Sequence, residues 1–412
     1  MVMANGEWKD QGISFNGHGT QDKPITLRAA TPGKVVLSGR SSLSITGQYL
    51  VVRGLYLKDG GGASNGIMIG GQHCRLTDSA VIGGTYKFFV HFAGTENRMD
   101  HCYVAGKTSD SPTVQIEVEK RPNHHRIDHN YFGPRPPLGR NGGETMRVGY
   151  SWQSMSNSAT VVEENLFDRC DGEIEIISSK SCENVYRNNT FLDCAGMLTL
   201  RHGNRCVVEN NFFLAHHKRG SGGIRVIGED HRILNNYIDG VAQGGIWITA
   251  GISNSPLKGY FQARNILIAS NTIVDCRGPC LDLDAGFGRS GRTLHPENVT
   301  IAMNLFSLPA DGVLIQGTEG AGFEWKGNIA EAKSNGASEI TSAMLKQTGV
   351  TLVQMDSKRR ADGLWEPNSQ DKVGKNQVGA GCDLVAGKGS SSRPLTAAEV
   401  GPSWLFRREA KP

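Results

Sequence analysis

The sequence segments ENLFD (164–168), NNTFLD (188–193), NNFFLA (210–215) and NNYIDG (235–240) share one form, an asparagine, one further residue and then an apolar or aromatic residue. The same form returns at wider intervals in HNYFG (129–133), SNTIVD (270–275) and MNLFSL (303–308). In the four closely spaced segments the asparagines are 22 to 25 residues apart, at positions 165, 189, 211 and 236. A recurring period of this size indicates a repeat architecture.

Short alternating segments lie between these units: GEIEIIS (172–178), MLTLRHG (197–203) and GGIRVIG (222–228). Their period of two predicts strands, with Ile174 and Ile176 on one face and polar residues on the other. Helical periodicity is nearly absent, apart from a short helix predicted near 339–347. This excludes helical repeat arrays, and leucine-rich repeats lack the Asn-x-Phe form. We therefore predict an all-β chain, a parallel β-helix solenoid in which stacked coils bury a common interior.

The recurring asparagine suits a coil corner. Asparagine tolerates the left-handed backbone conformation, and its side chain can hydrogen-bond its equivalent one coil away. The Phe, Ile and Leu residues that follow it would stack in the interior.

We expect one domain. Residues 1–335 form the catalytic β-helix, and residues 336–412 form its last coils and a cap, which includes the Gly- and Ser-rich stretch 379–392 and RPLTAAEVGPSWLF (393–406). The start, MVMANGEWKDQG, has no positively charged segment followed by an apolar core, so it shows no secretion signal, and it reads as though the chain begins partway through a coil. Either an export signal and a first strand were removed, or the protein is cytoplasmic as written.

Composition excludes several classes. A net charge of +4 is too small to argue for nucleic acid, and no stretch approaches the ~20 apolar residues of a membrane span. Nine cysteines cannot all pair within the chain, and the absence of CxxC disfavours structural zinc. Cysteines recur every twelve residues at 170, 182, 194 and 206, which favours small buried side chains over disulfides.

Stacked coils place residues one repeat apart at ~4.8 Å. Glu173 and Glu175 alternate around Ile174 and would share a face, with Lys180 following on the same coil. Arg201 lies 21 residues beyond Lys180, and Arg225 a further 24, each on the next coil. RNGGETMRVG supplies Asn141 and Glu144 from the coil before. We therefore predict a cluster of carboxylates and an amide beside a column of cations.

Oxygen ligands from Asn141, Glu173, Glu175 and Glu144 suit Ca²⁺. Salt bridges to Lys180 and the arginines are the alternative reading. A glycosidase pair of carboxylates is another, since same-face strand residues can meet the ~5 Å spacing of retaining enzymes. The adjoining cations fit lytic cleavage of a uronate better, because metal binding to the sugar carboxylate acidifies the C5 proton. Lys180 would then be the base, and Arg201 would donate a proton or hydrogen bond to the leaving oxygen.

The segments NGGETMRVG, GEIEIISSKS, LRHGN and GGIRVIG resemble polysaccharide lyase family 6, which holds alginate lyases and chondroitinase B. PITLRAATPGKVVLSG near the start and RPLTAAEVGPSW near the end extend the resemblance over nearly the whole chain. It implies a right-handed parallel β-helix and Ca²⁺-assisted β-elimination.

By motif, the resemblance makes Lys180 the Brønsted base, Arg201 the Brønsted acid, and Asn141, Glu173 and Glu175 the Ca²⁺ ligands, with Glu144 as a further candidate. His202 and Arg225 would bind substrate, and the NGGET form favours the alginate branch. Family members are exported, so the resemblance implies a secreted or periplasmic protein.

Other residues carry weaker expectations. His124, His125 and His129 in NHHRIDHN read as structural. His216, His217, Lys218 and Arg219 form a basic loop, either a polyanion contact or plainly solvated. Tyr260 is a candidate sugar contact.

We therefore predict an alginate lyase, cutting internally and existing as a monomer or weak dimer. A dermatan sulfate lyase and a non-catalytic carbohydrate-binding β-helix are the alternatives.

Overall fold

The computed structural model describes residues 1–62, 65–119, 121–309, 311–331, 349–353, 355, 357–367, 380–385 and 393–406. The helix predicted near 339–347 lies outside them, as does most of the stretch 379–392. The chain divides into two compact units: unit 1 comprises Met1–Gly196 and Leu395–Pro412, and unit 2 comprises Met197–Pro394. The expectation of a single domain stays a prediction.

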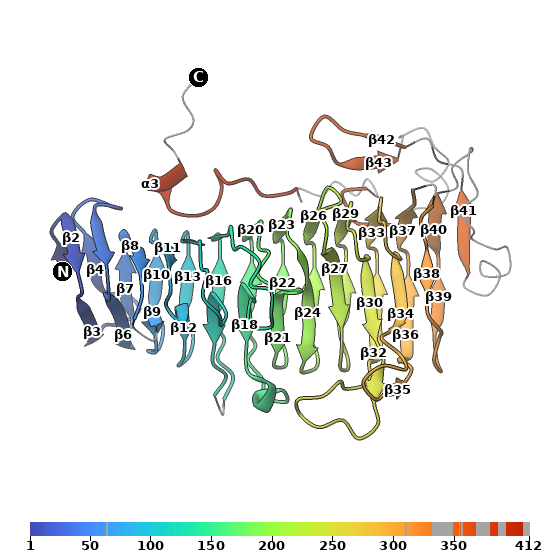
Figure 1. The fold of residues 1–412 in the computed structure, drawn as a ribbon, viewed down its shortest axis with the longest axis horizontal. Coiled ribbons are helices and arrows are strands. Elements are labelled where there is room, and N and C mark those ends of the chain that lie inside the picture. The colour runs from blue at the N-terminus through green and yellow to red at the C-terminus, as the bar shows by residue number, and fades with distance from the viewer. Residues whose placement is uncertain are drawn as a thin grey trace. The chain divides into compact units, whose positions relative to one another are not determined.

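Unit 1 is built from three parallel sheets that the chain visits in turn, coil after coil (Figure 1). The first sheet contains β1 (Val2–Met3), β4 (Ile25–Ala29), β7 (Leu50–Arg53), β10 (Arg75–Thr77), β13 (Arg98–Asp100), β16 (Arg126–Asp128), β19 (Val161–Glu163) and β22 (Val185–Arg187). The second contains β2 (Gly6–Lys9), β5 (Val35–Ser38), β8 (Leu55–Gly60), β11 (Ala80–Gly84), β14 (Tyr103–Ala105), β17 (Tyr131–Phe132), β20 (Leu166–Asp168) and β23 (Thr190–Leu192). The third contains β3 (Gly12–His18), β6 (Ser42–Gln48), β9 (Asn65–Ile69), β12 (Phe88–Phe92), β15 (Val114–Ile116), β18 (Met146–Val148) and β21 (Glu175–Lys180).

Unit 2 repeats this plan. Its first sheet contains β25 (Val207–Glu209), β28 (Arg232–Leu234), β32 (Arg264–Ala269), β36 (Glu297–Ala302) and β39 (Glu324–Lys326). Its second contains β26 (Phe212–Leu214), β29 (Tyr237–Asp239), β33 (Thr272–Val274), β37 (Leu305–Ser307), β40 (Asn328–Glu331) and β41 (Val350–Val353). Its third contains β24 (Gly196–His202), β27 (Ser221–Val226), β30 (Ile246–Thr249), β34 (Leu281–Ala285) and β38 (Ile315–Gln316). Two antiparallel pairs stand apart from these sheets, β31 (Gly251–Ile252) with β35 (Arg292–Leu294) and β42 (Ser357–Arg359) with β43 (Trp365–Pro367).

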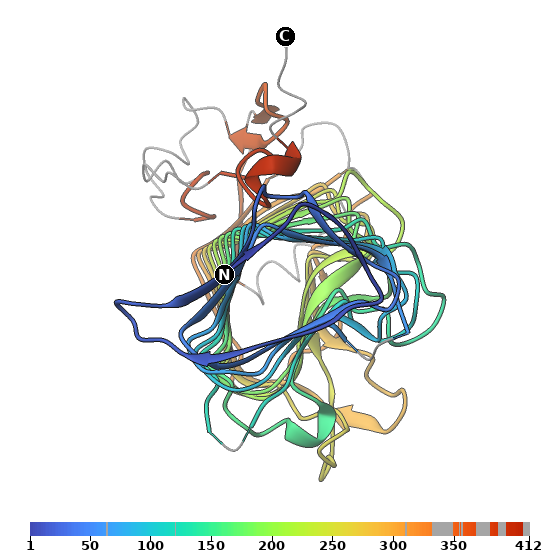
Figure 2. The same cartoon turned by 90° about the vertical axis from the view of Figure 1, so that its left-hand side faces the viewer.

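Seen end on, the blue coils of unit 1 wind around a central interior (Figure 2). Pairing between coils is parallel and in register: Arg75 of β10 pairs with Arg98 of β13, which pairs with Arg126 of β16. The predicted right-handed parallel β-helix is therefore confirmed as the fold of the chain. Among the described residues, no helix has the length and apolar character to cross a membrane.

The repeating asparagines form buried hydrogen-bonded ladders. In unit 1 the backbone N–H of Asn130 donates to Oδ1 of Asn165 at 2.9 Å, and that of Asn165 donates to Oδ1 of Asn189 at 3.1 Å. In unit 2 the ladder continues along Asn211, Asn236, Asn271, Asn304 and Asn328. Each amide satisfies corner backbone groups that would otherwise be buried without partners.

The expected place of the left-handed conformation is wrong by one residue. Positive φ angles belong to the residue before the ladder, as at Glu164 (54°) and Asn188 (54°). The preceding residue makes the turn, and this leaves the ladder asparagine free to point inward.

The interior confirms the apolar stacking. The rings of Phe132 and Phe167 stack with centroids 4.9 Å apart, and those of Phe167 and Phe191 with centroids 4.7 Å apart. All nine cysteines are buried and free, which confirms the prediction for them. Cys170 and Cys194 are stacked one coil apart, with the Cys170 N–H donating to Sγ of Cys194 at 3.3 Å.

The C-terminal segment of unit 1 lies along the outside of its second sheet. Val400 packs with Tyr131 and Leu166, and Ser403, at the start of α3 (Ser403–Phe406), donates its backbone N–H to Asp78 at 2.9 Å. These contacts tie residues 393–406 to the side of several coils.

Candidate active site

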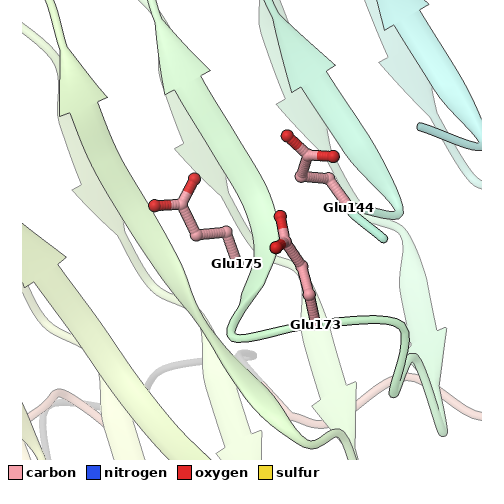
Figure 3. A group of neighbouring side chains, drawn as sticks. All are labelled: Glu144, Glu173 and Glu175. Carbon is pink, nitrogen blue, oxygen red and sulfur yellow. The ribbon is translucent and has the colours of Figure 1, made fainter. Parts of the chain in front are cut away.

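Three carboxylates meet where two neighbouring strands of unit 1 begin (Figure 3). Met146 of β18 pairs with Ile177 of β21, so Glu144 and Glu175, each two residues earlier, are at the same level. Glu173 reaches them from the turn before β21. One oxygen from each residue lies within 4.8 Å of the others. We call Glu144, Glu173 and Glu175 the acidic group.

The strand pattern here differs from the alternation read in the sequence. Ile174 was expected to face inward with Ile176, but it is 41% exposed, whereas Glu175 is 9% exposed. The cause is that β21 starts at Glu175, so Ile174 belongs to the preceding turn. The two carboxylates are brought together by that turn and not by same-face positions on one strand.

The acidic group is poorly compensated. Glu144 is only 1% exposed, and Oε2 of Glu144 and Oε1 of Glu173 are buried with no hydrogen-bond partner. Burial, then the charges of Glu144 and Glu175, raise the pKa of Glu173 to about 8. Buried carboxylate oxygens without donors are hard ligands that a divalent cation would satisfy. The acidic group therefore fits a metal ion.

Cations border the acidic group on one side. Nζ of Lys180, at the end of β21, lies 3.8 Å from Oε1 of Glu144, and Nη1 of Arg147 lies 3.6 Å from the same oxygen. Nε of Arg147 also donates to Oε1 of the buried Gln115 at 2.7 Å, which fixes the guanidinium. The Ser178 hydroxyl donates to Oε2 of Glu175. Lys180 thus stands at the edge of the acidic group, where the sequence predicted a base.

Unit 2 carries the remaining predicted side chains, and three of its arginines gather on one ring. The guanidinium carbons of Arg201, Arg225 and Arg292 lie 4.2, 5.7 and 4.8 Å from the ring centre of Tyr260. We call these three residues the arginine group. Burial would raise the pKa of Tyr260, but Arg201, followed by Arg225 and Arg292, lowers it below the ordinary value for tyrosine.

The loop that carries Tyr260 is held at several points. The Ile252 N–H donates to the Tyr260 carbonyl at 2.9 Å, and Nη1 of Arg201 donates to the Gly259 carbonyl at 2.8 Å. Nε2 of Gln262 donates to the carbonyl of His295 at 2.7 Å, just beyond the β31–β35 pair. These contacts fix the backbone of the loop at and around Tyr260.

Other predicted residues are placed as follows. His202 is buried, with Nδ1 3.4 Å from Nη1 of Arg201. Asn141 is exposed and lies three residues before Glu144; its role as a ligand stays a prediction, as does the expectation that Arg201 and Arg225 stand beside Lys180.

The histidines outside these groups have structural partners. His125 is fully buried, and Nδ1 accepts the Asn97 N–H at 3.2 Å. His129 contacts Asp128 at 2.9 Å. In the basic loop, Nε2 of His217 lies 3.2 Å from Asp275.

The chain matches known proteins along its whole length. The family described as chondroitinase B matches residues 1–361. The structure of the alginate lyase AlyGC, from polysaccharide lyase family 6, is 35% identical over 100% of this chain with a TM-score of 0.88. The chain belongs to polysaccharide lyase family 6. It spans 56% of the length of AlyGC.

Two further members of polysaccharide lyase family 6 give similar agreement. A mannuronic acid specific enzyme from human gut microbiota is 33% identical, with 86% of each chain covered and a TM-score of 0.79. Pedsa3628 from Pseudopedobacter saltans is 28% identical, covers 98% of this chain and 94% of its own, and has a TM-score of 0.78. No curated protein matches the chain.

Sequence reasoning missed several residues in or beside the acidic group and the arginine group. Arg147 could have been found, because it lies three residues after Glu144 in NGGETMRVG. Arg292 could not, because it comes from β35, in an insertion that carries no repeat signal. Arg135, which is buried and donates to the Glu144 carbonyl and to Thr113, also lies outside any recognised motif.

Proposed function

We propose that this chain is an alginate lyase that cleaves the 1,4-glycosidic bond by Ca²⁺-assisted β-elimination and leaves an unsaturated uronate. The observation that carries the proposal is the acidic group, with buried oxygens that lack donors, directly beside Lys180. A hydrolase would place two carboxylates about a sugar with room for water. Here the three carboxylates point into one space and suit a cation.

In the proposed reaction, Glu144, Glu173 and Glu175, with Asn141, would hold the ion. The bound Ca²⁺ would neutralise the carboxylate of the sugar and so acidify its C5 proton. Lys180 accepts that proton, because its amine is the basic group at the edge of the acidic group. Arg201, with His202 and Arg225, supports the substrate and the departing oxygen through charge-assisted hydrogen bonds.

Alginate is proposed as the substrate because the similar solved enzymes are named as alginate lyases, one of them as mannuronic acid specific. The ultraviolet absorbance of the unsaturated product tests this. Purified chain with Ca²⁺ should raise the absorbance of alginate, and mannuronate and guluronate blocks assayed separately should define its preference. No gain on any block would remove alginate from the proposal.

A dermatan sulfate lyase is the second candidate, because the matching family is described as chondroitinase B. The same absorbance assay on dermatan sulfate, run beside alginate, separates the two. Binding to either polymer without new unsaturated ends would instead favour a non-catalytic carbohydrate-binding β-helix.

The proposal includes three further expectations. Because the polymer is extracellular, we propose a secreted or periplasmic protein. Residues 1–335 are proposed as one catalytic domain with a cap from 336–412, acting as a monomer or weak dimer. Product sizes early in digestion test the internal mode of cutting, and light scattering tests the oligomeric state.

A further inference from the structure

Arg135 of unit 1 is a buried arginine, only 2% exposed, and its guanidinium bonds several oxygens at once. Nη1 donates to the hydroxyl of Thr113 at 2.9 Å and to the carbonyl of Glu144. Nη2 donates to three further backbone carbonyls, those of Ser109 (3.2 Å), Ser111 (3.0 Å) and Gly142 (3.3 Å). Arginine is seldom fully buried, so these hydrogen bonds have to offset its desolvation. Through Gly142 and Glu144 the guanidinium holds the segment that leads into β18.

The same side chain packs against the segment that leads into β21, the strand beside β18 (Figure 3). A Cβ on Gly172, the residue before Glu173, would lie 2.8 Å from Nε of Arg135. It would also lie 2.0 Å from the carbonyl oxygen of Gly143, the residue before Glu144. The two segments therefore meet at a pair of glycines, and Arg135 lies against both.

The backbone of Arg135 is bonded to the segment that leads into β21 as well. Its N–H donates to the carbonyl of Arg169 at 3.0 Å, and its carbonyl accepts the N–H of Asp171 at 2.9 Å. The residue is thus anchored on one segment and reaches the other with its side chain. The planar fork of a guanidinium suits this task, because its rigid N–H donors can bond several acceptors in fixed directions.

We propose that Arg135 is a positioning residue for the acidic group, which holds the carboxylates of Glu144 and Glu173 at the spacing that a divalent cation requires. This rests on the proposed function, in which the acidic group binds Ca²⁺. Arg135 acts through the two segments and contributes no ligand atom, because a guanidinium has no acceptor. Groups that orient metal ligands in this way contribute strongly to metal affinity.

The charge of Arg135 acts in the opposite direction from its position. Burial lowers the pKa of Arg135 to about 10, so the guanidinium is charged at neutral pH, and it interacts with the charges of Glu144 and Glu173. A positive charge near a cation site weakens cation binding. Removing Arg135 should therefore weaken Ca²⁺ binding if the residue positions the ligands, and strengthen it if only its charge matters.

Ca²⁺ binding to the purified chain, measured by titration calorimetry, separates the two effects. Arg135→Met keeps an unbranched apolar stem and removes the hydrogen bonds of the guanidinium. Its Kd for Ca²⁺ should rise about 10–100-fold above that of the wild type, the usual cost of removing a group that orients metal ligands. Arg135→Lys keeps the charge but has its three N–H donors on a single nitrogen, so its Kd should rise too, by a smaller factor.

Arg98→Met is the matched control, because Arg98 lies on β13 of the same unit and donates to Asp128 at 2.8 Å. It should lower the Tm measured without Ca²⁺ and keep the wild-type Kd. An equal rise of Kd in Arg98→Met would show that affinity follows general stability, and this would overturn the inference.

A Kd of Arg135→Met equal to or below that of the wild type would also overturn it. If thermal unfolding shows that Arg135→Met is not folded, the Kd of Arg135→Lys decides by the same rule. A wild type that binds no Ca²⁺ would remove the metal from the proposed function, and the role of Arg135 with it. A wild type and variants that bind Ca²⁺ equally well would remove only the role of Arg135.

Discussion

In unit 1 three carboxylates share one space, whereas in unit 2 three guanidinium groups share one ring. The two groups have opposite charge and different surroundings. Glu144 and Glu173 keep buried oxygens without donors, so the acidic group suits a cation. The arginine group surrounds the ring of Tyr260, and Arg201 also donates to the Gly259 carbonyl at 2.8 Å.

The difference suits two separate steps of the proposed reaction. On the proposed lyase function, a cation held by the acidic group would serve the step in which a proton leaves carbon. The arginine group would serve the step in which negative charge develops on oxygen. The two contributions can be tested separately.

The largest expected effect is on the base. Lys180→Ala should lower kcat by about 10²–10⁴-fold or more, because no other amine borders the acidic group among the described residues. It should be equally impaired on alginate and on a uronate with a 4-nitrophenoxy leaving group on C4, since both substrates must lose the C5 proton. Absorbance assays on the two substrates measure this. Lys58→Ala is the control, because Lys58 is an exposed lysine of β8 in the same unit. Recovery of activity by Lys180→Ala on the 4-nitrophenoxy substrate would remove Lys180 from the role of base.

The next effect concerns metal. Saturating Ca²⁺ at about 100 Kd should stabilise the wild type by about 2.7 kcal/mol, measured as a rise in Tm. Glu173→Gln should lose most of this rise and be at least as stable as the wild type without Ca²⁺, because one of three repelling carboxylates is gone.

Glu163→Gln is the matched control for that experiment. Glu163 is a carboxylate of unit 1 outside the acidic group, paired with Arg187 at 2.6 Å and Arg126 at 2.7 Å. It should lose stability with and without Ca²⁺ and keep the Ca²⁺-dependent rise. An unchanged rise in Glu173→Gln would show that the ion binds elsewhere.

A smaller effect is expected from thinning the arginine group. Arg292→Gln removes one of three charges that lower the pKa of Tyr260, so that pKa should move upward. The ultraviolet absorbance of the Tyr260 phenolate should therefore appear at higher pH in Arg292→Gln than in the wild type, because less positive charge stabilises it. A titration of the absorbance difference between each protein and its Tyr260→Phe variant measures this.

Arg289→Gln serves as the control for this titration, because Arg289 is exposed and precedes the same strand. Its titration curve should coincide with that of the wild type. A curve for Tyr260→Phe identical to that of the wild type would mean that the absorbance change comes from another tyrosine.

The repeat made the fold predictable, because each coil carries two residues that mark its corner, an asparagine and an aromatic or apolar residue after it. The asparagine fills the corner and the following aromatic residue fills the interior, as Asn165 and Phe167 do. Several such pairs at one period leave few alternative folds besides a parallel β-helix. The offset of the left-handed residue was not predictable from residue type, since Glu164 adopts the positive φ although the neighbouring Asn165 is the type that tolerates it better.

The acidic group could also be predicted, but for a partly mistaken reason. Glu173 and Glu175 were placed together by strand alternation, whereas a turn ending at Ile174 brings them together. Arg292 escaped prediction because it reaches Tyr260 from an insertion, where sequence spacing no longer converts to distance. The repeat period predicts which residues on neighbouring coils lie side by side, but it does not predict the positions of residues in the loops between coils.

The smallest expected effect concerns the buried histidines at the coil corners, a feature that the two units share. Both units contain a fully buried histidine among their described residues: burial lowers the pKa of His125 to about 3 and that of His231 to about 4. An unfolded histidine has a pKa near ~6.5. Below that pH the unfolded chain binds a proton that the folded chain does not bind, so the free energy of unfolding should fall as pH drops from ~6.5 toward the pKa of the folded state.

His125→Asn tests this, because it keeps an acceptor for the Asn97 N–H, as Asn184 provides for Thr160, and cannot titrate. Between about pH 6.5 and pH 4 its Tm should decline less than that of the wild type, and His231→Asn should do the same from unit 2. Parallel declines in all three proteins would mean that acid sensitivity comes from the carboxylates and not from the corners.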